Sequence, residues 1–99
     1  MAQSKHDQVA NRIAKKEGVK YNKGQGADVQ SSRRAIEVET AQTVNDASRQ
    51  LRGYRKPVYV AGVDDKAVKI ASKKYKGTSI GVMRPSGKIV KRSSRSRKK

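Results

Sequence analysis

Residues 27–39 read ADVQSSRRAIEVE, and this stretch decides how the rest of the chain is interpreted. Strand-forming residues gather at 27–30 and again at 35–39, and the polar run SSRR separates them. Two short strand-like runs around a polar connection predict a β-hairpin. The chain holds only eight acidic residues, and three of them, Asp28, Glu37 and Glu39, fall within this hairpin. We therefore take the hairpin as the candidate functional site.

The second predicted strand has two different faces. Because alternate residues of a strand point to opposite sides, Glu37 and Glu39 project together, and Ile36 and Val38 project the other way. Whether Asp28 points to the same side as the two glutamates depends on the number of residues that connect the two strands. A connection of four or two residues places Asp28 opposite Glu37, with Cβ atoms about 5 Å apart. A connection of three residues aims Asp28 away from them.

Three carboxylates this close repel one another, and each raises the pKa of the others unless a cation lies between them. Oxygen ligands of this kind suit a hard divalent cation, Mg²⁺ or Mn²⁺. Such a cation can bind a scissile phosphate, lower the pKa of an attacking water and neutralise developing charge. The alternative is that the acids form ordinary surface ion pairs with Arg33, Arg34 or neighbouring lysines, each worth about 0–1 kcal/mol.

On either side of the hairpin, helix and strand patterns alternate. The expected elements are a helix at 4–17 ended by Gly18, a short strand-like burst at 19–21, a helix at 43–51, a fully buried strand at 57–63, a helix at 64–75, and two strands within 78–90 around a Pro-Ser-Gly turn. This order predicts an α/β fold with a mixed central sheet flanked by helices. We expect residues 1–90 to form a single domain and residues 91–99 to form a basic, disordered tail.

Composition restricts the function. A chain of 99 residues has room for one small domain, and its formal charge of +17 predicts a polyanionic partner, with nucleic acid first. The absence of cysteine excludes thiolate chemistry. A single histidine does not support a serine-hydrolase triad, and the absence of the P-loop spacing gives no support for a nucleotide triphosphatase. No apolar run is long enough for a membrane span or a signal peptide, so we expect a cytoplasmic protein, nucleoid-associated in a prokaryote. Val, Ile, Leu and Phe together make up only 17 of the 99 residues, and so small a core also predicts a homodimer.

Basic residues outside the predicted core are candidates for contact with phosphates, which would make binding fall as salt rises. Four tyrosines without Phe or Trp make a poor stacking platform, so duplex or branched DNA fits better than single strands. The residues we expect to bind nucleic acid are Lys20, Lys23, Arg33, Arg34, Arg49, Arg52, Arg55, Lys73, Lys74, Arg95 and Arg97.

From about residue 5 to residue 83, the order of elements resembles the restriction-endonuclease-like nuclease superfamily, whose signature is PD-(D/E)xK. Gly26, Ala27 and Asp28 stand where the family has Pro and Asp. The run from Glu37 to Glu39 stands where it has an acid, any residue and usually Lys. Members include Holliday-junction resolvases, restriction enzymes and repair nucleases. The resemblance implies a restriction-endonuclease-like core, DNA as partner and a divalent metal as cofactor.

The resemblance also implies roles for other residues. Gln50 and Tyr54 resemble a QxxxY element that some members carry near the acidic site, and would orient substrate. Glu17 resembles a fourth acidic ligand that some members place on the first helix. Glu39 departs from the usual Lys, which orients or activates the attacking water, although Glu is known at this position in active members. Lys20 or Lys23 could supply a migrated ammonium group.

These observations predict a Mg²⁺-dependent endonuclease that hydrolyses phosphodiester bonds in duplex or branched DNA. In it, Asp28 and Glu37 hold one or two metal ions, and Glu39 binds metal or acts as a base. A second hypothesis is a non-catalytic protein on the same scaffold that binds DNA or structured RNA, in which the missing Lys marks lost activity. A third is an RNA-associated protein of ribosomal type. Dependence on metal separates the first hypothesis from the other two.

Overall fold

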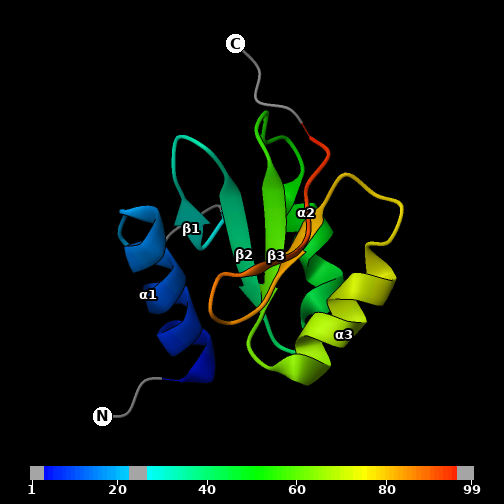
Figure 1. The fold of residues 1–99 in the computed structure, drawn as a ribbon, viewed down its shortest axis with the longest axis horizontal. Coiled ribbons are helices and arrows are strands. Elements are labelled where there is room, and N and C mark those ends of the chain that lie inside the picture. The colour runs from blue at the N-terminus through cyan, green and yellow to red at the C-terminus, as the bar shows by residue number, and fades with distance from the viewer. Residues whose placement is uncertain (1–3, 23–26, 96–99) are drawn as a thin grey trace.

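The structure is a computed structural model that describes residues 4–22 and 27–95. It has three layers, with a five-stranded sheet between helices (Figure 1). The elements are α1 (Lys5–Glu17), β1 (Val29–Gln30), β2 (Ala35–Glu39), the 3₁₀ turn η1 (Val44–Asp46), α2 (Ala47–Leu51), β3 (Val58–Gly62), α3 (Asp65–Lys74), β4 (Gly81–Met83) and β5 (Ile89–Lys91). The expected α/β fold with a mixed sheet flanked by helices is confirmed.

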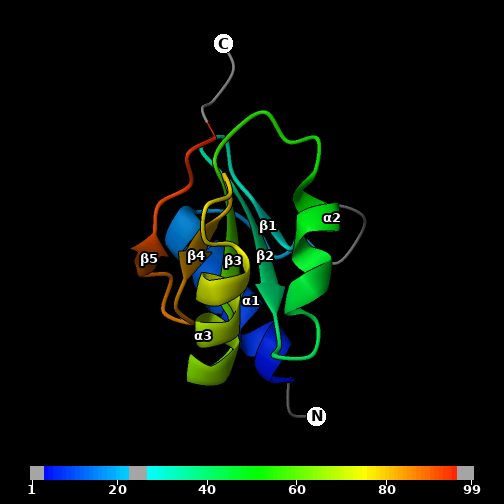
Figure 2. The same cartoon turned by 90° about the vertical axis from the view of Figure 1, so that its right-hand side faces the viewer.

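The sheet has the strand order β1-β2-β3-β4-β5. The central pairs β2–β3 and β3–β4 are parallel, and the two outer pairs are antiparallel. Each parallel step needs a crossover, and right-handed crossovers between successive neighbours place their helices on one face of the sheet. Accordingly, η1, α2 and α3 cover one face, and α1 covers the other (Figure 2).

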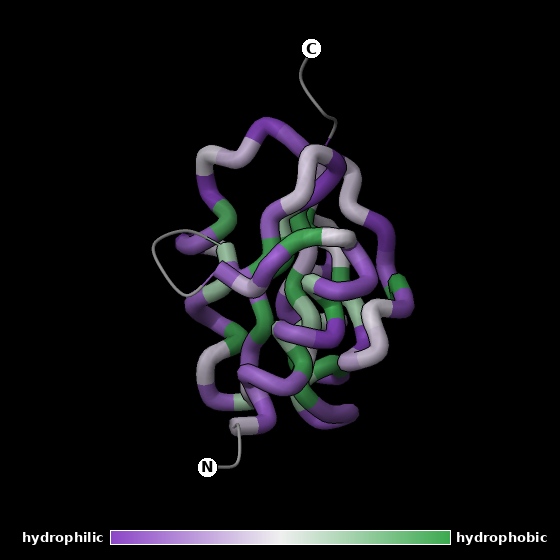
Figure 3. The backbone as a smooth tube through the Cα atoms, turned by 90° about the vertical axis from the view of Figure 1, so that its left-hand side faces the viewer, coloured by the Kyte–Doolittle hydropathy of each residue, from purple (hydrophilic) through white to green (hydrophobic). Residues whose placement is uncertain are grey.

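Two apolar clusters fill the spaces between the layers. Val58 and Val60 of β3 face α2 and α3, whereas Tyr59 and Ala61 face α1. The predicted strand at 57–63 is thus buried on both sides, as its unbroken apolar run indicated. In Figure 3, the hydrophobic positions run through the middle of the molecule, and hydrophilic positions form most of the outer segments.

Local signals set the helix ends. Ser4 caps α1 by accepting a hydrogen bond from the Asp7 amide at 3.1 Å, and Gly18 ends it in a left-handed conformation, φ 75°. Asp64 caps α3 in the same way, accepting from the Ala67 amide at 2.9 Å. The second helix is shorter than expected, because Thr43 accepts a hydrogen bond from the Thr40 amide instead of capping it.

The C-terminal segment begins differently from our prediction. Lys91, where the basic tail was expected to start, is the last residue of β5. The next residues lie against the domain, since the Ser93 hydroxyl accepts from the Val58 amide at 3.2 Å and donates to the Ser79 carbonyl at 2.7 Å. Residues 96–99 lie outside the described part. No helix within residues 4–22 and 27–95 is long and apolar enough to cross a membrane.

The close approach of α3 to β3 requires glycine at position 62. A Cβ added to Gly62 would lie 2.6 Å from the Val68 backbone nitrogen and 2.8 Å from its Cγ2. We expect Gly62→Ala to lower the free energy of unfolding by about 1–3 kcal/mol, because α3 must move away from the sheet. Urea unfolding measures this. Asn45→Ala, at an exposed position, should change it by less than about 0.5 kcal/mol, and equal effects would contradict the packing argument.

Candidate active site

The β1–β2 hairpin aligns the predicted acids. Four residues connect the strands, and Val29 pairs with Ile36, so Asp28 lies beside Glu37 across the hairpin. Ser31 holds the connection closed, because its hydroxyl accepts hydrogen bonds from the Arg33 and Arg34 amides, both at 3.2 Å. The structure therefore has the four-residue connection that places Asp28 opposite Glu37.

Asp28 is fixed from two directions. Its Oδ2 accepts a hydrogen bond from the Val38 amide at 2.9 Å and lies 3.2 Å from Nε2 of His6. Its backbone carbonyl accepts from the Asn22 amide at 2.8 Å. The side chain retains 14% exposure, which makes it the most accessible of the three hairpin acids.

Glu37 and Glu39 project toward the face that α2 and α3 cover, and both are buried. The pKa of Glu37 is raised to about 9, mainly by burial and in smaller part by a hydrogen bond with Asp28 and by the charges of Asp28 and Glu39. Burial also raises the pKa of Glu39, against the lowering effect of a hydrogen bond with Thr43. The mutual repulsion that the sequence predicted is present for Glu37, but desolvation is the larger effect.

Neither buried glutamate is neutralised by a basic side chain. Among the described residues, no ion pair includes Glu37 or Glu39, and Oε2 of Glu37 accepts no hydrogen bond. The protein has 25 Lys and Arg residues, and none of those within 4–22 and 27–95 forms an ion pair with either carboxylate. The alternative interpretation was that the hairpin acids form surface ion pairs with Arg33, Arg34 or neighbouring lysines, and none of the described Lys or Arg residues forms such a pair with them.

The two hairpin arginines pair with Glu17 instead. Oε1 of Glu17 lies 3.5 Å from Nη2 of Arg33 and 3.6 Å from Nε of Arg34, and it accepts a hydrogen bond from the Ser31 hydroxyl at 3.2 Å. Glu17 lies eleven residues beyond His6 on α1, about 16 Å along the helix axis. The structure therefore places Glu17 at the hairpin turn and not with the other acids, where the resemblance implied a fourth ligand.

His6, which we did not select from the sequence as a site residue, joins the site. His6 lies on the inward face of α1, one turn before Val9 and Ala10, and its Nδ1 lies 3.2 Å from the Tyr21 hydroxyl. That hydroxyl donates to Oδ1 of Asp7 at 2.9 Å. The spacing of His6 from Val9 and Ile13, three and seven residues on, was the signal that could have found it.

Tyr54 contacts the backbone next to the site. Its hydroxyl accepts a hydrogen bond from the Ala27 amide at 3.0 Å, directly before Asp28. Gln50 is exposed on α2 and lines a shallow hollow with Arg52, Gly53 and Tyr54. Within the described residues, the Gln50 side chain forms no hydrogen bond. The structure thus connects Tyr54 with Asp28 and leaves Gln50 facing solvent.

The remaining basic candidates are spread over the surface. Arg49 pairs with Asp46 at 3.7 Å and is largely exposed. Arg95 is held inside the fold, because its Nη1 donates to the Leu51 carbonyl at 2.9 Å and the Tyr54 carbonyl at 3.1 Å. Exposed side chains include Lys20, Arg52, Arg55, Lys73 and Lys74. Lys23 and Arg97 lie outside the described residues.

The hairpin offers oxygen atoms of the kind that a hard cation binds, but it does not arrange three acidic residues around one point. Asp28 and Glu37 offer carboxylate oxygens, and one buried oxygen of Glu37 has no protein partner among the described residues. No group of three or more Asp, Glu or His residues within 4–22 and 27–95 is arranged to hold a metal ion. The pair of Asp28 and Glu37 therefore fits a cation chemically, and Glu39 is not placed as a third ligand.

Comparison with known proteins finds no matching family model, no matching curated protein and no matching solved structure.

The raised pKa of Glu37 has a consequence for stability. Because the folded protein holds this proton up to about pH 9 and the unfolded chain releases it near pH 4.5, the free energy of unfolding falls as pH rises between these values. We expect Glu37→Gln, which cannot ionise, to reduce that fall in urea unfolding measured in EDTA. Asp65→Asn, at an exposed acid, is the control. Identical pH slopes in wild type and Glu37→Gln would disprove the burial argument.

Proposed function

We propose that the protein is a divalent-metal-dependent DNA endonuclease of the restriction-endonuclease-like type. The observation that carries this proposal is the pairing of Asp28 with buried Glu37, whose Oε2 lacks a hydrogen-bond partner in the described part of the chain. A buried carboxyl without a cationic partner costs stability, so it is expected where chemistry needs it. The order of helices and strands supports the resemblance to the superfamily.

Asp28 and Glu37 would hold Mg²⁺ or Mn²⁺ between their carboxylates. Their side chains lie next to each other across the hairpin, and two carboxylates this close favour a proton or a cation between them. A divalent cation in place of that proton satisfies both carboxylates. When bound, the cation lowers the pKa of an attacking water and neutralises charge on the phosphate.

The protein's own residues set the positions around this pair. The Val38 amide fixes Oδ2 of Asp28, and the Tyr54 hydroxyl fixes the backbone before it. Tyr54 therefore acts as a positioning residue. The Asp28 side chain would meet the substrate, since it remains partly exposed whereas the glutamates are buried.

Glu39 would act as a base and not as a metal ligand. It lies two residues beyond Glu37 on β2, about 6.6 Å along the strand, and points to the same face. Burial raises its pKa, which makes its carboxylate a stronger proton acceptor. In the proposed reaction it accepts the proton of the attacking water, the task that the usual Lys assists in the superfamily. Gln50 would contact the substrate from the exposed side of α2.

A second candidate function is nucleic-acid binding without catalysis. The cover that α2 forms over Glu37 and Glu39, together with the replacement of the usual Lys, favours it. This candidate needs no metal, and it predicts that the exposed basic residues contribute all of the affinity for DNA or structured RNA.

Cleavage of supercoiled plasmid and of branched DNA, with Mg²⁺, Mn²⁺ or EDTA, tests the proposal. We expect nicking that requires metal and falls by about 100-fold or more in Asp28→Asn and in Glu37→Gln, because a metal supplies several kcal/mol to the transition state. Binding to the same DNA in EDTA should persist in both variants.

Asp65→Asn is the matched control, since it removes an acid on the exposed start of α3. It should cut as the wild type does. Tight binding without cutting under any metal would overturn the endonuclease and establish the non-catalytic binder. Equal cutting by wild type and both site variants would assign the activity to a contaminant.

The homodimer is a separate proposal. The sheet ends in two short strands, β1 and β5, and Val90 of β5 is the one large apolar side chain exposed among the described residues. Sedimentation equilibrium should therefore give twice the monomer mass of 10.9 kDa. A mass of one chain at micromolar concentration would exclude the dimer.

A further inference from the structure

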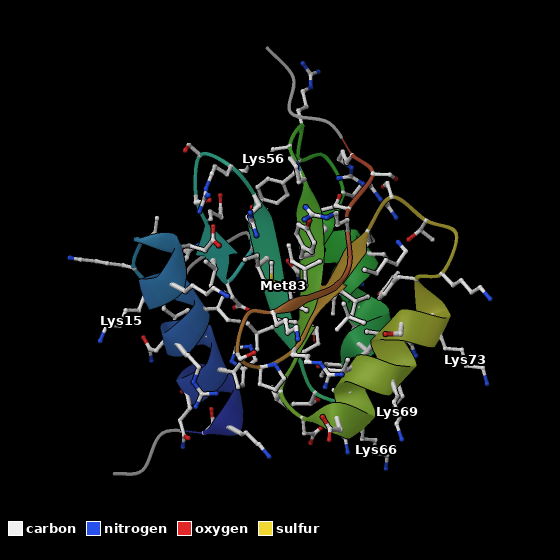
Figure 4. The ribbon with its side chains drawn as sticks, in the orientation of Figure 1. Lys15, Lys56, Lys66, Lys69, Lys73 and Met83 are labelled. Carbon is white, nitrogen blue, oxygen red and sulfur yellow. The ribbon has the colours of Figure 1, made fainter. Side chains whose placement is uncertain are left out.

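We propose that α3 carries the main contact surface for the backbone of duplex DNA. Lys66, Lys69 and Lys73 project from its outer side, opposite the buried Ala67 and Ala71 (Figure 4). Their spacing of three and four residues places them along one line on the helix surface. We call these three lysines the α3 ridge. Two of them, Lys66 and Lys69, were not among the basic residues singled out from the sequence.

The α3 ridge has no partner within the described part of the protein, whereas several other basic groups are engaged. Arg33 and Arg34 face Glu17, and Arg95 donates to backbone carbonyls. By contrast, no ridge lysine forms a hydrogen bond or an ion pair with any residue in 4–22 or 27–95.

The two acids at the start of α3 are also engaged. Asp64 accepts a hydrogen bond from the Ala67 amide at 2.9 Å, and Asp65 lies 3.7 Å from Nη1 of Arg84. The ridge charges therefore repel one another in the free protein, and a polyanion would relieve that repulsion.

The length of the α3 ridge matches a duplex backbone. Seven residues of helix separate Lys66 from Lys73, about 10.5 Å along the axis. One strand of a B-form duplex presents a phosphate about every 3.4 Å along its axis, so this distance covers about three phosphates. A rigid helix can meet them without first being ordered.

The surroundings of the ridge disfavour other polyanions. Val90, on β5, is the only exposed large apolar side chain in the described residues, so α3 has nothing to insert into a lipid surface. Tyr59 and Tyr75 are buried and cannot stack on the bases of a single strand. A regular row of phosphates, read without regard to sequence, is the partner that remains.

The choice of DNA rests on the proposed function. Glu37 and Glu39 project to the same face of the sheet that α3 covers. A duplex held on the ridge therefore lies on the side of the molecule where α2 and the glutamates are found. The ridge would supply affinity, and the hairpin would supply chemistry.

Fluorescence anisotropy with a 20-base-pair duplex in EDTA tests the inference. We expect the triple variant Lys66→Gln, Lys69→Gln, Lys73→Gln to bind on the order of tenfold or more weakly, with a salt dependence reduced by roughly one unit of slope per lysine. The loss should be the same for duplexes of different sequence. Circular dichroism should show an unchanged fold, since all three side chains are exposed.

The matched control removes the same charge from the other face. Arg12, Lys15 and Lys16 are exposed on α1, and Lys15 points away from the domain on the side opposite α3 (Figure 4). Their triple replacement by Gln should weaken binding much less. Equal losses in both variants, or unchanged binding in the α3 variant, would overturn the inference. Tighter binding of duplex RNA than of DNA, lost in the same variant, would overturn the assignment to DNA.

These measurements separate the ridge from the endonuclease. Binding that depends on the ridge in a protein that cuts nothing would overturn the proposed function alone. Metal-dependent cutting with unchanged binding in the α3 variant would overturn the ridge alone.

Discussion

The four-residue turn of the β1–β2 hairpin is the constraint on which the candidate site depends. A shift of one residue would exchange the two faces of β2 and bring Ile36 and Val38 to the positions of the glutamates. Ser31 prevents this shift, because its hydroxyl accepts two amide hydrogen bonds and its own amide donates to the Arg34 carbonyl at 2.9 Å. The turn itself is tied to α1, since the same hydroxyl lies 3.2 Å from Glu17. A salt-bridged turn at one end of the hairpin thus fixes the register of the acids at the other.

The buried acids are expensive for so small a protein. Glu37 and Glu39 occupy positions on β2 that apolar residues would fill with a gain in stability. Their neighbours on the same face, Ala35, Val58 and Val60, are apolar and fully buried. Local sequence rules and stability conflict at this point, and such conflicts are typical of functional sites. The rest of the sheet shows no similar conflict, because Glu37 and Glu39 are the only buried charged residues on its described strands.

Strong local patterns made most of the fold predictable. The spacing of Val9, Ala10 and Ile13, with Gly18 after them, fixed α1, and the alternation at 35–39 fixed β2 to the residue. The run at 19–21 was also read as a strand-like burst, but it forms no strand. There the Val19 amide closes the end of α1 on the Ala14 carbonyl, and the Tyr21 hydroxyl contacts His6. Long-range contacts decide such a segment, and its own residues do not contain them.

The same division holds for the site. The sequence reduced the position of Asp28 to a choice between connection lengths, and the four-residue connection of the structure places it beside Glu37. Which helix end meets the hairpin depends on the packing of α1, which brings His6 to Asp28 and carries Glu17 away. The burial of Glu39 likewise depends on α2, which follows it in the chain. Residues joined by tertiary packing were therefore missed or misplaced, and residues joined by one turn were not.

The distribution of charge explains how one protein could both attract DNA and bind a metal ion. A protein of charge +17 attracts a polyanion from any direction, yet an unscreened carboxylate repels a phosphate at contact. Both conditions are met when the cations lie outside, on α3 and the exposed loops, and the acids lie inside, under α2. The field of the surface then brings the duplex in, and the local repulsion at Asp28 and Glu37 is removed only by a cation between carboxylate and phosphate. This arrangement requires that no basic side chain lies beside the two acids. An arginine beside Glu37 would neutralise the pair of Asp28 and Glu37, and no site for a metal would remain.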